Sequence, residues 1–178
     1  MSGIKTVIQN VLDRVSSETD IAFVRIFNNQ FRYMEEGKIE GFPMPCAFVE
    51  ISNPTNHQQL AQGFTQADLL VRIHIGADQY DAGDGTMEQN MTIFDLRDQI
   101  VKALTYYQPA KCGRMMKVSE NQDFEHTNLY HYIVEFTMGF VDSEGDNTAA
   151  EIDYGPPTTL EIDPTIETTI TVSQWPAP

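Results

Sequence analysis

The chain has 178 residues, of which 26 are acidic and 11 basic, so its formal net charge is −15 at pH 7. A surface of this charge repels phosphate, which argues against a nucleic-acid reader or a binder of anionic membranes. No run of about 18 apolar residues occurs, so no membrane span is predicted, and the first residues lack the apolar region of a signal peptide. Cys46 and Cys112 have no Cys partners at metal-ligand spacing, which favours buried thiols in a reducing compartment over a disulfide.

The acidic charge is concentrated near the C-terminus. From Met1 to Lys117 there are 14 acidic and 11 basic residues, a net charge of −3. From Val118 to Pro178 there are 12 acidic residues and no basic ones, a net charge of −12. We interpret this charge chiefly as solvation of the surface.

Apolar periodicity predicts the secondary structure in chain order. Residues 3–17 carry Val7, Val11 and Val15 on one stripe and predict a helix. Alternation with a period of two predicts strands, and a second stripe predicts another helix. The strands are 21–27, 46–52, 67–75, 114–120 and 130–141, and the second helix is 91–104. The Asn- and Gln-rich stretch 52–66 is interpreted as a long polar loop.

The order of these elements predicts an α+β fold. We expect a mixed, mainly antiparallel sheet with one well-buried side and two helices packed on it, plus an extended β-rich C-terminal arm. The core domain is predicted to span residues 1–142 and the acidic arm residues 143–178.

Motifs that would carry chemistry are incomplete. The stretch DQYDAGDGTMEQ places Asp78 and Gly83 as a calcium loop would, but Gln89 stands where the bidentate acid is needed. The four histidines, His57, His74, His126 and His131, show no zinc-ligand spacing. On one continuous strand, His126 and His131 would face opposite sides. We therefore assign no catalytic, metal-binding or cofactor-binding residues, no cofactor and no enzymatic activity.

The order of elements resembles that of the tail-terminator (tail-completion) proteins of tailed bacteriophages. The resemblance is carried by IKTVIQNVLDRV, FPMPCAFVEI, ADLLVRIHI, MTIFDLRDQIVKAL and HTNLYHYIVEFTMGFV, which cover most of residues 3–142. It implies a structural virion protein that forms a homo-oligomeric ring, expected to be a hexamer, at the head–tail neck or the head-proximal end of the tail. The expected neighbours are the tail tube and the neck or connector proteins, with a sheath as a further candidate. The expected location is the virion, and the host cytoplasm during assembly.

Two segments are predicted to contact such neighbours. The stretch 52–66 offers Leu60 and Phe64 as its large apolar residues. In the arm, TTLEI and TTITV favour strands, and Asp163-Pro164 between them favours a turn. The predicted interface residues of the arm are Leu160, Ile162, Ile166, Ile170, Val172 and Trp175.

A different class of function stays open. In this alternative the chain is a small-molecule- or metal-binding module, or a hydrolase, that uses the Asp-rich loop together with His74 and His131 near the sheet face. A closed ring in solution, or incorporation into virions, favours the structural role, whereas metal-dependent turnover favours the alternative. Neither reading involves sequence-specific nucleic acid or a membrane.

Overall fold

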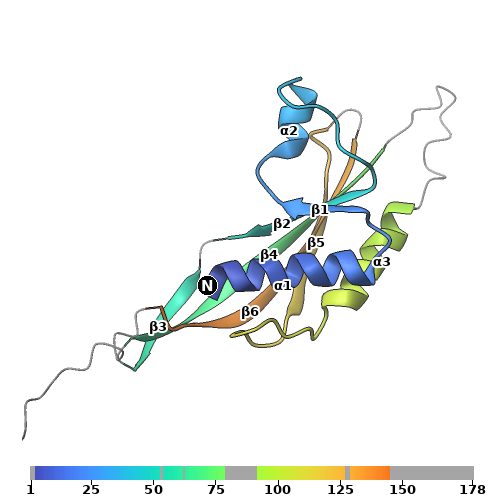
Figure 1. Ribbon diagram of the computed structural model, residues 1–178. Helices are drawn as coiled ribbons and strands as arrows, with labels where there is room; N and C mark the ends of the chain where they lie inside the picture. The colour runs from blue at the N-terminus through green and yellow to red at the C-terminus, as the bar shows by residue number, and fades with distance from the viewer. Residues whose placement is uncertain (1–2, 53, 62, 79–91, 127–128, 145–178) are drawn as a thin grey trace, which may run out of the picture. The chain divides into compact units, whose positions relative to one another are not determined.

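A computed structural model of the protein describes residues 3–52, 54–61, 63–78, 92–126 and 129–144 (Figure 1). The elements in chain order are α1 (Gly3–Glu18), β1 (Phe23–Ile26), α2 (Gln30–Glu35), β2 (Cys46–Ile51), β3 (Thr55–Ala61), β4 (Phe64–Asp78), α3 (Thr92–Leu104), β5 (Met116–Asp123) and β6 (Leu129–Asp142). The stretch DQYDAGDGTMEQ, except for Asp78, and the predicted arm, except for Ser143 and Glu144, lie outside the described residues. No helix in the described part is both long and apolar enough to span a membrane.

The six strands form one mixed sheet. Their order is β1-β2-β4-β6-β5, and β3 pairs with the first half of β4 on the same side as β2. Only β1 and β2 run parallel, and the other pairs are antiparallel. The α+β fold with a mixed, mainly antiparallel sheet is therefore confirmed.

The helices α1 and α3 pack on the same face of this sheet (Figure 1). The predicted stripe of α1 is confirmed, because Val7, Val11 and Val15 are buried. The inward alternation of β4 and β6 supplies the other wall of the core, with residues such as Ile73 and Phe136 fully buried. These side chains drive the packing because each removes apolar surface from water, at about 25 cal/mol per Å².

The opposite face of the sheet carries a second, smaller apolar cluster that the sequence did not predict. Its buried members are Phe31, Cys46, Phe48 and Leu129, and its partly buried members are Phe23, Phe27, Phe42 and Met44. Phe31 comes from α2, a third helix absent from the prediction. Its ring is 5.1 Å from that of Phe48 in an edge-to-face arrangement, a favourable aromatic geometry. The helix α2 thus covers part of the face that was expected to be solvated.

The prediction of a long polar loop at 52–66 is wrong. Within it, β3 pairs antiparallel with β4 and forms a hairpin, with Gly63 at φ +81° just before β4. Strand β3 was missed because its sequence, TNHQQLA, has no apolar alternation. Backbone pairing to the extended start of β4 supports it instead. Of the predicted interface residues, Leu60 lies on β3 and is 54% exposed, and Phe64 begins β4 and is half-buried.

Candidate functional site

A chain of histidines and carboxylates lies beside the smaller apolar cluster, on the face of the sheet that α2 covers. We call it the histidine–carboxylate network; its members are Glu35, Glu50, His74, Asp123, His126 and His131. Strands β2, β4, β5 and β6 supply Glu50, His74, Asp123 and His131, α2 supplies Glu35, and the β5–β6 turn supplies His126. The network therefore joins four strands to the helix.

The two histidines on the sheet are almost completely buried. His74 is 5% and His131 is 3% exposed. Their alternation on β4 and β6 turns them away from the main core, opposite to Ile73 and Tyr132. Nδ1 of His74 lies 3.0 Å from Nε2 of His131. Nε2 of His74 lies 3.0 Å from Oε2 of Glu50, and Nδ1 of His131 lies 3.1 Å from Oδ2 of Asp123.

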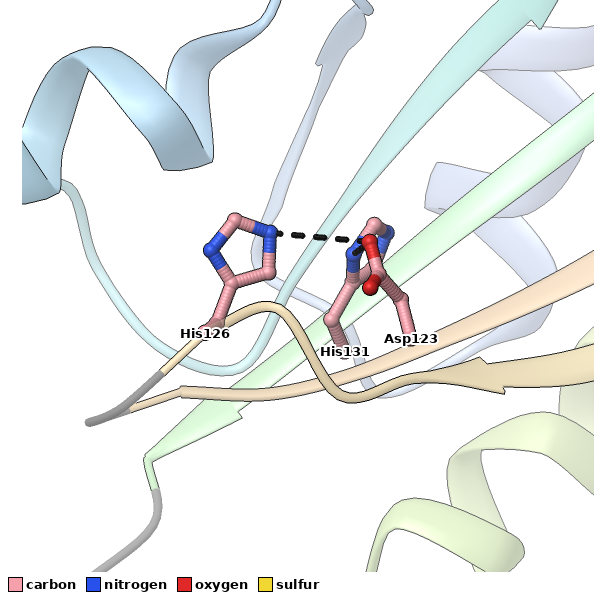
Figure 2. A group of neighbouring side chains, drawn as sticks. All are labelled: Asp123, His126 and His131. Atoms are coloured by element: carbon pink, nitrogen blue, oxygen red, sulfur yellow. Dashed lines mark hydrogen bonds and ion pairs between the residues drawn. The ribbon is translucent and has the colours of Figure 1, made fainter.

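The third histidine reaches the network from the turn that follows β5. Nδ1 of His126 lies 2.9 Å from Oε2 of Glu35, and its Nε2 lies 3.8 Å from Oδ2 of Asp123. Figure 2 shows His126 and His131 approaching the Asp123 carboxylate from two directions. One donor atom from each of these three side chains lies within 4.8 Å of the others. Two imidazoles and one carboxylate at this separation are a donor set that can hold a divalent metal ion.

Aromatic rings enclose the network. The ring of Phe27 is stacked on His74 at 3.8 Å with an interplanar angle of 2°. The ring of Phe31 lies 4.6 Å from that of His131 and 5.8 Å from that of His126. These apolar walls limit the access of water to the histidines, which strengthens their electrostatic interactions.

Burial sets the protonation of the two sheet histidines. Burial, together with the nearby His74 and His126, lowers the pKa of His131 to about 4, against the opposing effect of Asp123. Burial also lowers the pKa of His74, despite its hydrogen bond to Glu50. Burial alone would raise the pKa of Asp123. The backbone N–H of Glu125 and the neighbouring imidazoles nevertheless lower it below its ordinary value.

A second polar group continues the same face of the sheet toward the middle of β4. Arg72 donates through Nε to Oε1 of Glu135 at 2.6 Å, and its Nη1 lies 3.5 Å from Oε2 of Glu50. Ser119 on β5 donates to the other oxygen of Glu135. These contacts raise the pKa of Arg72, and the hydrogen bond from Ser119 is the largest cause that lowers the pKa of Glu135. Charged partners thus face one another across three strands.

From the sequence, His74 and His131 were predicted to lie near the sheet face only in the alternative function, and no metal ligands were predicted. No single continuous strand holds both His126 and His131, so the condition under which they would face opposite sides is not met. Asp123 ends β5 directly opposite His131 on β6, and His126 lies in the intervening turn. The alternation of β6, which places His131 on the side away from Tyr130 and Tyr132, was the one sequence signal available.

Two of the predicted interface residues lie within the described part of the chain. Leu60 and Phe64 lie at the β3–β4 hairpin, whereas Leu160, Ile162, Ile166, Ile170, Val172 and Trp175 lie outside the described residues. Other large apolar side chains are exposed on the strands at the two ends of the sheet: Ile26 on β1, and Met116 and Val118 on β5. Comparison of the chain with protein-family models finds no match, and neither does comparison with curated proteins.

Proposed function

We propose that this chain is a structural subunit of a bacteriophage virion. In this role it forms a homo-oligomeric ring, a hexamer by the resemblance described above, at the head–tail neck or the head-proximal end of the tail. The ring terminates or joins the tail and lines the passage for DNA. Its neighbours are the tail tube and the neck or connector proteins, and its role is assembly without catalysis.

The observation that carries the proposal is the pair of unlike edges of the sheet, neither of which pairs with a further strand in the described part of the chain. One edge is β5, where Met116 is 46% and Val118 is 52% exposed. At the opposite edges lie Ile26 on β1, 53% exposed, and Leu60 on β3, 54% exposed. A contact between one edge and the other edge of the next copy is head-to-tail, and such contacts close into rings when the rotation between copies allows it.

Edge strands that expose apolar side chains favour association with another chain. Val118 is the extra residue of an irregularity between Lys117 and Ser119, which interrupts regular pairing along β5. We therefore expect the copies to meet through side chains of β5 rather than through one uninterrupted ladder of backbone hydrogen bonds.

The charge of the chain is compatible with a passage for DNA. With a net charge of −15, the protein offers little attraction to phosphate, so DNA can move past it without sticking. We accordingly expect no measurable affinity for duplex DNA at moderate salt, and salt-sensitive micromolar binding would count against this role.

The test is the mass of the purified full chain in solution, measured by light scattering, together with electron microscopy of the protein and of assembled particles. A closed ring, or incorporation at the tail end of virions, is the expected result. Val118→Lys should keep the folded domain intact and weaken the ring, because an exposed apolar side chain is replaced by a charge at the contact. Ile39→Lys is the matched control, since Ile39 is also exposed but lies outside all the strands.

A strictly monomeric chain that also fails to enter virions would refute the proposal. If Val118→Lys and Ile39→Lys weakened the ring equally, β5 would not be part of the contact between copies. The alternative role as a hydrolase relied on the Asp-rich loop, of which residues 79–91 lie outside the described residues. Metal-dependent turnover by a monomer would favour that alternative.

A further inference from the structure

Three side chains at the β5–β6 turn present the spacing of a small metal centre. Nδ1 of His131 lies 3.1 Å and Nε2 of His126 lies 3.8 Å from the same oxygen, Oδ2 of Asp123. Donor atoms bound to one tetrahedral Zn²⁺ at its usual bond lengths are about 3.3–3.5 Å apart. All three donor atoms lie within 4.8 Å of one another. Movements of the side chains, chiefly of His126 in the β5–β6 turn, would therefore bring these atoms to bonding positions.

Each imidazole of this group is held on its far side, as metal-binding histidines are. His126 meets Glu35 through Nδ1 at 2.9 Å. His131 meets His74 through Nε2 at 3.0 Å, and His74 in turn meets Glu50 at 3.0 Å. Partners of this kind fix the tautomer and the orientation of the ring, and they raise the basicity of the ligand nitrogen. The hydrogen bonds that lead away from the three side chains therefore end at a carboxylate on each side: Glu35 beyond His126, and Glu50 beyond His131 and His74.

Without a bound cation, the two neutral sheet histidines have too few N–H groups to form hydrogen bonds in all of their nitrogen contacts. A neutral imidazole has one N–H, and an ionised carboxylate only accepts. If His74 donates to Glu50 and His131 donates to Asp123, the facing nitrogens Nδ1 of His74 and Nε2 of His131 both present lone pairs at 3.0 Å. Both rings are almost completely buried, where an unsatisfied polar atom destabilises the folded state.

A metal ion bound to Nδ1 of His131 removes this conflict. The N–H of His131 then moves to Nε2 and is donated to Nδ1 of His74, and the N–H of His74 is donated to Glu50. In the same way, a metal ion on Nε2 of His126 leaves its Nδ1–H to be donated to Glu35. Every nitrogen of the three rings then has a suitable partner, with all three imidazoles neutral.

From this geometry we propose that Asp123, His126 and His131 bind one Zn²⁺ ion. Two imidazoles and one carboxylate favour a borderline transition metal over Mg²⁺ or Ca²⁺, which prefer sets of oxygen ligands. Three protein ligands leave one coordination position for water. Because Glu35 belongs to α2 and the ligands belong to β5, β6 and their turn, the ion fastens α2 to this end of the sheet. The site is independent of the proposed ring.

The test uses the full chain, freed of metal with a chelator and then titrated with Zn²⁺ in the presence of excess Mg²⁺. One Zn²⁺ per chain is expected, with a rise in the unfolding temperature. His126→Ala and Asp123→Asn should each weaken binding by about tenfold or more, and Glu35→Gln by about tenfold. His57→Ala is the matched control: His57 is exposed on β3 and contacts Pro54, so the affinity should not change.

The tautomer of His131 provides a readout that does not depend on affinity. Long-range ¹⁵N NMR of the zinc-loaded protein should show the proton of His131 on Nε2 and a metal-bound Nδ1. Absence of saturable Zn²⁺ binding, displacement of Zn²⁺ by excess Mg²⁺, or unchanged affinity in a folded His126→Ala variant would each overturn the proposal. Circular dichroism establishes that the variants are folded, and His126, in the turn, is the ligand whose replacement disturbs the core least.

Discussion

Nδ1 of His74 and Nε2 of His131 lie 3.0 Å apart between two buried rings, and the other nitrogen of each ring meets a carboxylate. These three contacts together require three N–H donors, whereas two neutral imidazoles provide only two. The contact between His74 and His131 therefore stabilises the protein only if Nδ1 of His131 carries a metal ion instead of the ring's proton. The identity of residue 74 should consequently affect the zinc-loaded protein more than the metal-free protein.

We predict that His74→Phe reduces the stabilisation that Zn²⁺ gives. Phenylalanine keeps a ring against Phe27 but offers no acceptor to the N–H of a zinc-bound His131. The zinc-loaded variant should lose about 1–3 kcal/mol of unfolding free energy relative to the zinc-loaded wild type. Without metal, the difference should be about 1 kcal/mol or less. Urea unfolding with and without Zn²⁺ measures both, and equal stabilisation of variant and wild type by Zn²⁺ would contradict the prediction.

Gly76→Ala should destabilise the protein by overpacking the smaller apolar cluster. A Cβ at Gly76 would lie 2.7 Å from Cε1 of Phe31 and 2.9 Å from Sγ of Cys46. Both neighbours are buried, and the Phe31 ring is enclosed by Phe42, Phe48 and His131, so it cannot easily move away. We expect a loss of about 1–3 kcal/mol in urea unfolding.

The control for this variant is Gly139→Ala on β6. A Cβ at Gly139 has nothing within 4 Å, and its φ is not in the left-handed region. The change should therefore alter the free energy of unfolding by about 0.5 kcal/mol or less. If the two variants were equally stable, the tight packing between Gly76 and α2 would not contribute to stability.

Arg97→Lys should weaken the attachment of α3 to β5 in a pH-dependent way. Arg97 donates through Nε and Nη2 to both oxygens of Glu120, at 2.8 and 2.7 Å, a fork that lysine cannot reproduce. Burial alone would raise the pKa of Glu120, but hydrogen bonds from Arg97 and Lys117 lower it below its ordinary value of 4.5. Because both side chains are partly exposed, we expect a loss of about 0.5–1 kcal/mol at pH 7.

The sign of the pH effect follows from the lowered pKa. A carboxyl group with a lowered pKa in the folded state contributes stability above its ordinary pKa and loses it as pH falls through the folded value. The difference between wild type and Arg97→Lys should therefore shrink as the pH falls below the ordinary carboxyl pKa of 4.5. Unfolding measured at a series of pH values tests this, and a difference that is constant down to pH 3 would exclude the ionised Glu120 as its source.

The helix α1 and the central strands could be predicted from the sequence because their apolar side chains face the core and their polar side chains face away from it. Val7, Val11 and Val15 repeat at helical spacing, and Leu69, Val71 and Ile73 alternate along β4. Strand β3 and helix α2 could not be found in this way. The side chains of β3 are largely solvent-exposed on both faces, and α2 is six residues long with Phe31 as its one buried residue. Pairing with distant strands and packing on Phe48 determine these elements.

The histidine–carboxylate network was beyond sequence reasoning for a related reason. Its members lie in five different elements and one turn, and pairs such as Glu35 and His126 are 91 residues apart. Periodicity does place His74 and His131 on the face opposite the main core. It cannot show that Asp123 ends β5 opposite His131, because that depends on the position of the turn and on the irregularity after Lys117.

The thiol of Cys112 should react slowly in the native protein. Burial raises its pKa from 9.0 to about 11, so the reactive thiolate at pH 8 is about 100-fold scarcer than for an ordinary thiol. Cys46 is also fully buried. We expect little reaction with a thiol reagent such as DTNB under native conditions and two equivalents in urea. Rapid native labelling of either cysteine would show that its surroundings open readily.

The predicted C-terminal arm, residues 143–178, lies outside the described residues except for Ser143 and Glu144. Its sequence offers two β-branched segments, TTLEI and TTITV, with a turn signal at Asp163-Pro164 between them. Two strands alone are marginally stable in water, so the predicted apolar face, with residues such as Leu160 and Ile170, would need a partner surface.

The sequence Gly155-Pro156-Pro157 favours a stiff, extended spacer before these segments, and Trp175 follows them as the predicted anchor. We therefore expect residues 158–175 to dock on a neighbouring subunit or an adjoining ring. Deletion of residues 153–178 should leave a folded core with an unchanged unfolding transition that assembles poorly. A Trp175→Ala variant of the full chain should show the same defect in milder form. Particle counts and electron microscopy measure assembly, and normal numbers of stable particles from the truncated chain would show that the arm does not join the subunits.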